Sequence, residues 1–131
     1  MICADTSSLV ALLAGETGPD VDMVRQALSD RTLCVSPVSV TELLSDPDPM
    51  PSPGQLVAQI PRLEISPGYW ERAGELRAQM FRLRLRPKMA DTLIAQSCLD
   101  HGIALITRDR NFSSFGEVAG LRLLAMGDLL H

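Results

Sequence analysis

"PKMADTLIAQSCLDHGIALITRDRNF", residues 87–112, joins a largely apolar helix pattern to an apolar, β-branched strand pattern. A helix that leads into a buried strand is typical of α/β folds with a parallel sheet. One aspartate opens the helix pattern and another follows the strand pattern, at Asp91 and Asp109. A single aspartate in such a place is an ordinary cap or turn residue. Two on consecutive elements indicate an acidic site if the rest of the chain supplies further ligands.

The remaining chain repeats the alternation of strand and helix patterns. Strands are predicted at "ICA" (2–4), "TLCVS" (32–36), "RLEI" (62–65), "IALIT" (103–107) and "LRLLAM" (121–126). Helices are predicted at 9–15, 18–30, 37–45, 55–60, 67–86 and 89–102, with a short one at the C-terminus, and the proline-rich stretch 46–54 is predicted to be a loop. We therefore expect an α/β fold with a central parallel sheet flanked by helices on both faces.

Size and composition restrict the class of protein. A chain of 131 residues with 46% hydrophobic residues predicts a single domain, residues 1–131. The three cysteines form no CxxC pair and lie in apolar runs, so they are interpreted as buried small side chains in a reducing compartment. The N-terminus lacks a basic signal region, and no uncharged apolar run is long enough to span a bilayer. These features predict a cytoplasmic protein with no membrane partner.

Carboxylates recur where the predicted strands end. Asp5 follows the first strand, Asp109 follows "IALIT", Glu42 lies in the helix after the second strand, and Asp91 opens the helix before "IALIT". Ligands of parallel sheets collect at the carboxyl ends of the strands. Each acid alone has a structural explanation as a cap, a turn residue or a solvated side chain. Two carboxylates about 4 Å apart repel by about 1 kcal/mol in water and about 4 kcal/mol at an effective dielectric near 20. A cluster of them therefore needs a cation or protons.

Carboxylate ligands select hard cations such as Mg²⁺ or Mn²⁺. Such an ion lowers the pKa of a bound water and neutralises charge on a phosphoryl group, which suits phosphodiester hydrolysis. The sequence offers no Ser-His-Asp or Cys-His arrangement and no glycine-rich phosphate loop, so a nucleotide-dependent kinase or ATPase is not expected.

Three blocks carry a resemblance to a known family. "ADTSSLVALL" (4–13), "VSPVSVTELL" (35–44) and "KMADTLIAQSCLDHGIALITRDRNF" (88–112) are similar, in order and spacing, to the PIN-domain family, and above all to its VapC-like toxins. The resemblance implies Mg²⁺- or Mn²⁺-dependent endoribonuclease activity, a homodimer and an antitoxin partner. It also implies that Asp5, Glu42, Asp91 and Asp109 are the catalytic and metal-binding acids.

The resemblance also assigns supporting residues. Thr107 falls on a hydroxyl position that helps orient the family's site, and Ser7 is expected to act similarly. Asn111 stands where many relatives have a further acid, which leaves the division of work around Asp109 open.

Half of the 12 basic residues lie between Arg72 and Lys88. They are either the solvated face of a long helix or a path for RNA phosphates. On the second interpretation Arg82, Arg84 and Arg86 bind RNA.

These observations lead to one main hypothesis and two rivals. The main hypothesis is an endoribonuclease that uses Mg²⁺ or Mn²⁺ to hydrolyse RNA phosphodiester bonds as the toxin of a VapBC-type pair. The first rival is a non-catalytic PIN-like module that binds RNA or protein and has a weakened metal site. The second is a receiver-type phosphoacceptor domain, which expects a lysine after a late strand, whereas the only lysine, Lys88, precedes a helix.

Overall fold

The computed structural model describes residues 1–47 and 53–125. Four strands, β1 (Ile2–Ala4), β2 (Leu33–Cys34), β3 (Leu105–Ile106) and β4 (Leu123–Leu124), form one parallel sheet in the order β2-β1-β3-β4. The helices are α1 (Thr6–Leu13), α2 (Pro19–Ser29), α3 (Pro37–Leu44), α4 (Pro53–Gln59), α5 (Tyr69–Arg82), α6 (Met89–His101), the 3-10 helix η1 (Arg110–Phe112) and α7 (Ser113–Ala119). The predicted α/β class is confirmed.

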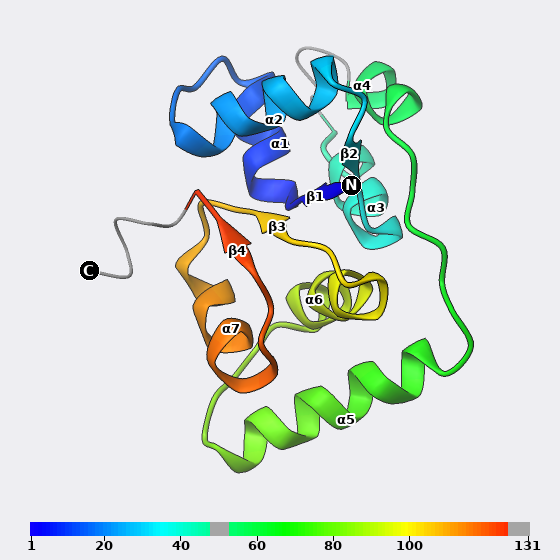
Figure 1. Cartoon of the computed structure of the whole chain (residues 1–131), viewed down its shortest axis with the longest axis vertical. Helices are drawn as coiled ribbons and strands as arrows, with labels where there is room; N and C mark the ends of the chain where they lie inside the picture. The colour runs from blue at the N-terminus through cyan, green and yellow to red at the C-terminus, as the bar shows by residue number, and fades with distance from the viewer. Residues whose placement is uncertain (48–52, 126–131) are drawn as a thin grey trace.

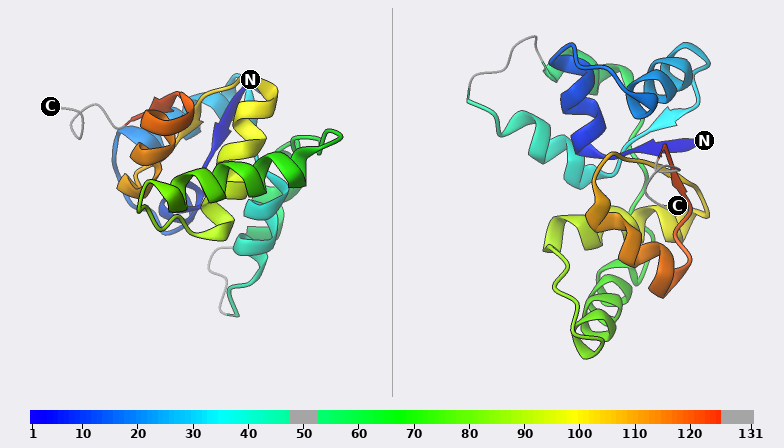
Figure 2. Two further views of the ribbon diagram at one scale, coloured as in Figure 1. Left: turned by 90° about the horizontal axis from the view of Figure 1, so that it is seen from below. Right: turned by 90° about the vertical axis from the view of Figure 1, so that its left-hand side faces the viewer.

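The sheet separates two hydrophobic cores. Helices α1, α2 and α4 lie on one side of it, and α6 and α7 lie on the other, with α5 outside α6 (Figures 1 and 2). Successive strand residues alternate between the cores: Cys3 and Leu105 pack toward α6, whereas Ala4 and Ile106 pack toward α1 and α2. Because side chains alternate across a strand, even two-residue strands contribute to both layers.

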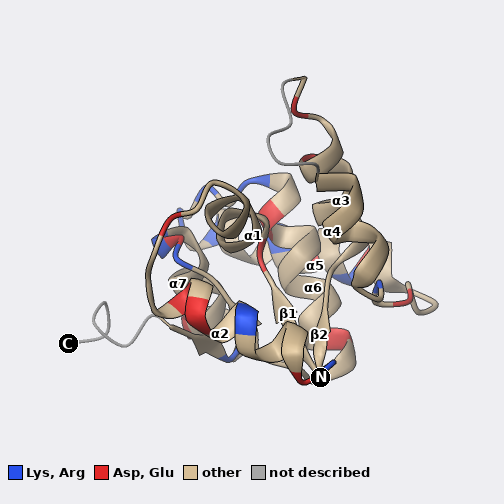
Figure 3. Ribbon diagram, turned by 90° about the horizontal axis from the view of Figure 1, so that it is seen from above, with Lys and Arg blue, Asp and Glu red and all other residues tan. Residues whose placement is uncertain are grey.

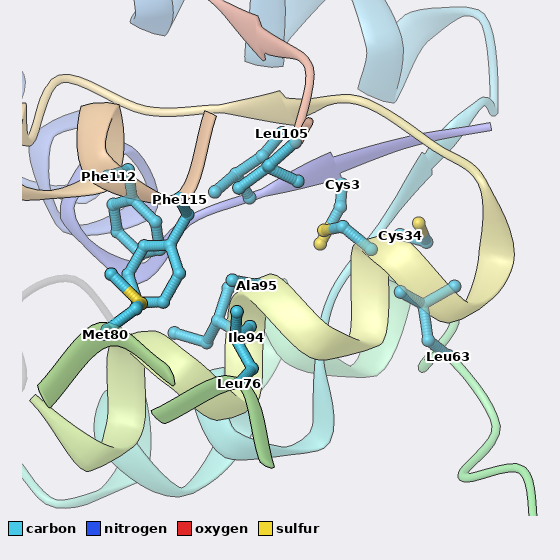
Figure 4. Packing of buried hydrophobic residues seen from close by; sticks show 12 residues of the cluster. Cys3, Cys34, Leu63, Leu76, Met80, Ile94, Ala95, Leu105, Phe112 and Phe115 are labelled. Atoms are coloured by element: carbon cyan, nitrogen blue, oxygen red, sulfur yellow. The ribbon is translucent and has the colours of Figure 1, made fainter. Parts of the chain in front are cut away.

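The core beneath the sheet, on the α6 side, is built from aromatic, aliphatic and sulfur-containing side chains. Phe112 and Phe115, from η1 and α7, pack beside Met80 of α5 and Ile94 of α6 (Figure 4). Cys3, Cys34 and Cys98 are buried and unbridged, as the sequence predicts. The packing of η1 and α7 holds the chain that follows β3 against α6.

Local sequence explains where several helices begin and end. Ser36 caps α3 by accepting a hydrogen bond from the Val38 amide at 3.4 Å, and Pro37 occupies the first turn. Gly102 ends α6 with a φ of 62°, a conformation that costs glycine little. These signals fix the boundaries of the helices that carry Glu42 and Asp91.

The structure corrects three predictions. "RLEI" is not a strand of the sheet, since only an isolated bridge joins Arg62 to Val35. The helix predicted over 67–86 ends at Arg82, because the chain turns at Arg84 with a φ of 65°. Helix α7 was not predicted at all. The predicted C-terminal helix lies outside the described residues.

The strand order creates a switch point between β1 and β3. The chain leaves β1 toward β2 on one side, and β3 returns on the other side. Crevices at such points, beyond the carboxyl ends of the strands, are the usual ligand sites of parallel sheets. Within the described residues, no helix is long and apolar enough to cross a membrane.

Candidate active site at the carboxyl edge of the sheet

Asp5 occupies the switch point directly after β1. Its amide donates to the Ile106 carbonyl at 2.9 Å, and the residue is 3% exposed. Its Oδ2 accepts hydrogen bonds from Ser7 Oγ at 2.5 Å and Thr107 Oγ1 at 2.9 Å. Burial raises the pKa of Asp5, and the two hydroxyls oppose that rise. The hydroxyls predicted as supporting residues therefore contact this carboxylate.

Thr107 links Asp5 to the loop that carries Asp109. The Thr107 hydroxyl donates to Asp5 and accepts from the Asp109 amide at 2.9 Å. Asp109 Oδ1 in turn accepts from the Asn111 amide at 2.9 Å and caps η1. One buried hydroxyl thus holds the ends of β1 and β3 in register. Asn111 makes this contact through its backbone amide.

Asp91 lies half-buried in the first turn of α6, and its pKa is raised to about 6. Burial is the largest cause, followed by the charges of Asp5 and Asp109. Lys88 lowers the pKa and Glu42 adds a smaller rise. The four predicted acids therefore lie within electrostatic range of one another.

Glu42 is the outer member of this acidic cluster, which we define as Asp5, Glu42, Asp91 and Asp109. It lies exposed on α3 rather than against buried surface, and its Oε1 accepts from Thr6 Oγ1 at 2.7 Å. The same Thr6 oxygen lies 3.0 Å from Ser39 Oγ. Thr6 was not predicted as a site residue, although its hydroxyl stands directly after Asp5 in the sequence.

Arg108 was also missed, and it fastens the loop between Thr107 and Asp109 to α2. Its Nε donates to Asp20 Oδ2 at 2.8 Å, and its Nη2 donates to Asp20 Oδ1 at 3.0 Å and the Thr17 carbonyl at 3.1 Å. A Cβ on Gly18 would lie 2.8 Å from Asp20 Oδ1 and 3.0 Å from Arg108 Nη2, so the site needs glycine there. The only signal in the sequence is an arginine between two site residues.

The basic residues between Arg72 and Lys88 differ in their contacts within the described part of the chain. Arg72 pairs with Asp100, and Arg77 donates to the Pro87 carbonyl. Arg86 lines a cleft beside Asp91, whereas Arg82 and Arg84 do not line it. Acidic and basic ribbon segments lie near each other beside α1 (Figure 3). Of the three arginines predicted to bind RNA, Arg86 alone borders the acidic cluster through this cleft.

The donors of the acidic cluster suit a hard divalent cation. They are carboxylate and hydroxyl oxygens, the ligand type that Mg²⁺ and Mn²⁺ prefer. In the described part of the chain, no three His, Cys, Asp or Glu side chains are already arranged as a metal site. Burial is the largest cause of the raised pKa of Asp91, and the repulsion by Asp5 and Asp109 that adds to it is what a bound cation would relieve.

Solved structures with the same fold come from toxin–antitoxin systems. The chain is similar to VapBC2 from Rickettsia felis bound to a promoter DNA fragment, with a TM-score of 0.74, 18% identity, and 94% of this chain and 97% of that chain covered. For DNA-bound VapBC from Salmonella typhimurium the TM-score is 0.72 and the identity 17%, with 94% of this chain and 97% of that chain covered. For VapBC-5 from Mycobacterium tuberculosis the TM-score is 0.66 and the identity 19%, with 93% of this chain and 95% of that chain covered. At these identities the likeness shows the fold alone.

Sequence comparison identifies the family directly. None of the curated protein sequences matches this chain. The model of the PIN domain, however, matches residues 2–118, nearly the whole chain. Since the matched residues also form the four-stranded parallel sheet's switch point with acids at its carboxyl edge, the chain belongs to the PIN-domain family.

Proposed function

We propose that this protein is a Mg²⁺- or Mn²⁺-dependent endoribonuclease and the toxin of a VapBC-type toxin–antitoxin pair, acting in the cytoplasm. The observation that carries the proposal is the acidic cluster at the switch point of a PIN-domain sheet, with oxygen donors only. Within the cluster, Asp5, Asp91 and Asp109 would hold the metal, and Glu42 would complete the site from α3. A bound divalent cation would activate water and neutralise charge on the phosphoryl group.

The surrounding residues keep the carboxylates in place before substrate arrives. Ser7 and Thr107 both donate to Asp5, so the orientation of this carboxylate is fixed without an opposing charge. Thr107 and the Asn111 amide orient the Asp109 loop. Fixed oxygen donors of this kind lower the reorganisation needed during phosphoryl transfer. Asp91 is only half-buried, which keeps its carboxylate within reach of a substrate.

The toxin role is supported by the solved neighbours, which are VapBC complexes. By analogy we propose a cognate antitoxin as the protein partner and a homodimer as the assembly. Co-expression with the product of the adjacent reading frame tests this role. A stable complex that loses nuclease activity is expected, whereas a nuclease that elutes alone and is harmless to its host would not be a toxin of this kind.

The nuclease activity is tested by incubating purified protein with single-stranded RNA and Mn²⁺, with chelator as a control. Asp91→Asn is expected to lower the cleavage rate by about 100-fold or more, because it removes one ligand charge from the acidic cluster. Asp22→Asn, an exposed residue of α2, is the matched control and should cleave at the wild-type rate. A folded Asp91→Asn protein that cleaves normally would remove Asp91 from the mechanism.

A non-catalytic PIN-like binding module is the second candidate. It is favoured by Asn111, which stands where many relatives have an acid and offers the cluster no charge. RNA binding without metal-dependent cleavage in the same assay would support it over the nuclease.

A further inference from the structure

A cleft of about 290 Å³ opens next to the acidic cluster. Asp91 lines it together with Arg86, Lys88 and Arg110, which come from the segment before α6 and from η1. Asn111 of η1 and Ser113 and Ser114, at the start of α7, also line it. Its size is at the lower end of the range for small-molecule sites, so it suits one nucleotide-sized group.

The cations of the cleft form no ion pair in the described part of the chain, although Lys88 acts on the charge of Asp91 and the Arg86 guanidinium lies over the Phe81 ring. The ion pairs in the described part of the chain use Arg72 and Arg108. Arg86, Lys88 and Arg110 have no carboxylate within ion-pair distance among the described residues. Three cations line the cleft against one carboxylate, Asp91, so an anion bound between the cations is favourable. A phosphate group provides such an anion.

The two serines restrict what else the cleft can bind. Ser113 Oγ donates to the Arg110 carbonyl at 2.7 Å, and Ser114 Oγ donates to the Asn111 carbonyl at 3.2 Å. A hydroxyl has one hydrogen, so both oxygens are left as acceptors. A ligand that suits this cleft therefore combines a phosphate with hydrogen-bond donors, as a ribonucleotide does through its phosphate and its 2′-hydroxyl.

We propose that this cleft is a subsite for the nucleotide adjacent to the scissile phosphate of single-stranded RNA. Lys88, Arg110 and Arg86 bind its phosphate, and either Ser113 or Ser114 accepts from its 2′-hydroxyl. The inference rests on the proposed function, since it places the scissile phosphate at the acidic cluster. Because Asp91 belongs to both the cluster and the cleft wall, one strand can occupy the two at once.

The test measures RNA binding separately from cleavage. The probe is a fluorescent single-stranded RNA of mixed sequence, about 12 nucleotides long. All proteins carry Asp5→Asn, which prevents cleavage on the proposed mechanism without altering a residue that lines the cleft. Lys88→Gln with Arg110→Gln forms the cleft pair. Arg25→Gln with Arg31→Gln, both exposed and outside the cleft, is the control pair with the same change in charge.

We expect the cleft pair to weaken RNA binding by roughly 10-fold and to reduce the slope of log affinity against log salt by about 1.4, since two phosphate contacts are lost. The control pair should change affinity by less than about twofold. Ser113→Ala with Ser114→Ala should reduce the preference for RNA over DNA of the same sequence. An equal loss of RNA affinity in the cleft pair and the control pair would overturn the subsite. So would a cleft pair that binds RNA normally but no longer binds a protein partner. Thermal melting checks that all variants are folded.

Cleavage by the protein without Asp5→Asn distinguishes this inference from the proposed function. If that protein cleaves RNA while the two charge pairs bind alike, the nuclease stands and the subsite is wrong. If it does not cleave RNA while the cleft pair alone loses affinity, the subsite for RNA stands and the proposed chemistry is wrong.

Discussion

Carboxylates in two regions of this molecule have pKa values shifted in opposite directions. In the acidic cluster, burial raises the pKa of Asp5 and Asp91 above the ordinary value. On α2, burial would also raise the pKa of Asp20, but the hydrogen bonds and charge of Arg108 outweigh it and lower the pKa. At the end of α6, the Arg72 guanidinium lowers the pKa of Asp100.

The difference lies in what the chain supplies as a partner. Asp20 and Asp100 each accept bidentate hydrogen bonds from an arginine, so their charges are neutralised within the protein. Asp5 receives two hydroxyls, and Asp109 receives a backbone amide. Hydroxyls and amides orient a carboxylate without cancelling its charge. The paired carboxylates therefore serve the fold, and the acidic cluster retains charge for a ligand.

The sharpest test of this contrast is the response to a divalent cation. Mn²⁺ at about 100 times its Kd should raise the free energy of unfolding by about 2.7 kcal/mol, because it binds only the native arrangement of the acidic cluster. Asp91→Asn should remove most of this gain, and Asp100→Asn should keep it. Melting of metal-free protein with and without Mn²⁺ measures the effect. A gain that survives Asp91→Asn and Asp5→Asn together would place the cation elsewhere.

Breaking a paired carboxylate should destabilise the protein. Asp20→Asn leaves the Arg108 guanidinium without its charged partner and should lower the free energy of unfolding by about 2 kcal/mol. Urea unfolding measures this loss. Asp22→Asn, on the same helix but exposed, should change stability by only a few tenths of a kcal/mol and serves as the matched control. Equal effects at the two positions would mean that the Asp20–Arg108 pair contributes nothing.

Removing a charge from the acidic cluster should have the opposite effect. The pKa of Asp91 is about 6 in the folded protein against an ordinary 3.8, so its stabilising contribution is present at low pH and is lost as pH rises through about 6. Burial opposes its ionisation most, the charges of Asp5, Asp109 and Glu42 add to that effect, and Lys88 favours ionisation.

The free energy of unfolding of metal-free Asp91→Asn should therefore rise relative to the wild type as pH increases from about 4 to about 6, and the gain of about 1 kcal/mol, allowing for solvent screening of this half-buried group, should persist at higher pH. Urea unfolding at several pH values measures the gain. A difference in stability that does not change with pH would mean that neither burial nor repulsion within the acidic cluster raises the pKa of Asp91.

The smallest effect is expected at Asp100. Its partner Arg72 is 40% exposed, whereas Arg108 is 33% exposed, and Asp100 also accepts from Gln96 at 2.8 Å. Asp100→Asn should therefore lower the free energy of unfolding by less than Asp20→Asn does, because water already screens the guanidinium. Urea unfolding of the two variants under identical conditions makes the comparison. A larger loss at Asp100 would reverse the ranking of the two pairs.

Much of the site follows from the order of residues along the chain. Strand patterns at 2–4 and 103–107 place Asp5 and Asp109 after neighbouring strands, and any parallel pairing of those strands brings the two acids together. Thr107 and Ser7 lie within two residues of these acids and contact Asp5, and their role in orienting the site stays a prediction. "RLEI" was misjudged because its apolar pattern fits a strand, but it meets Val35 at only a single bridge.

What the sequence determined by itself is local: the alternation of strand and helix patterns, the positions of the caps, and the acids at the strand ends. These depend on side-chain periodicity and backbone preferences within a few residues. Tertiary structure alone decided which charges are neutralised. Arg108 lies 88 residues from Asp20, and Arg72 lies 28 residues from Asp100. Pairing over such distances depends on the packing of whole helices against the sheet, which no local pattern encodes. The same packing leaves Asp5 without a neighbouring cation among the described residues.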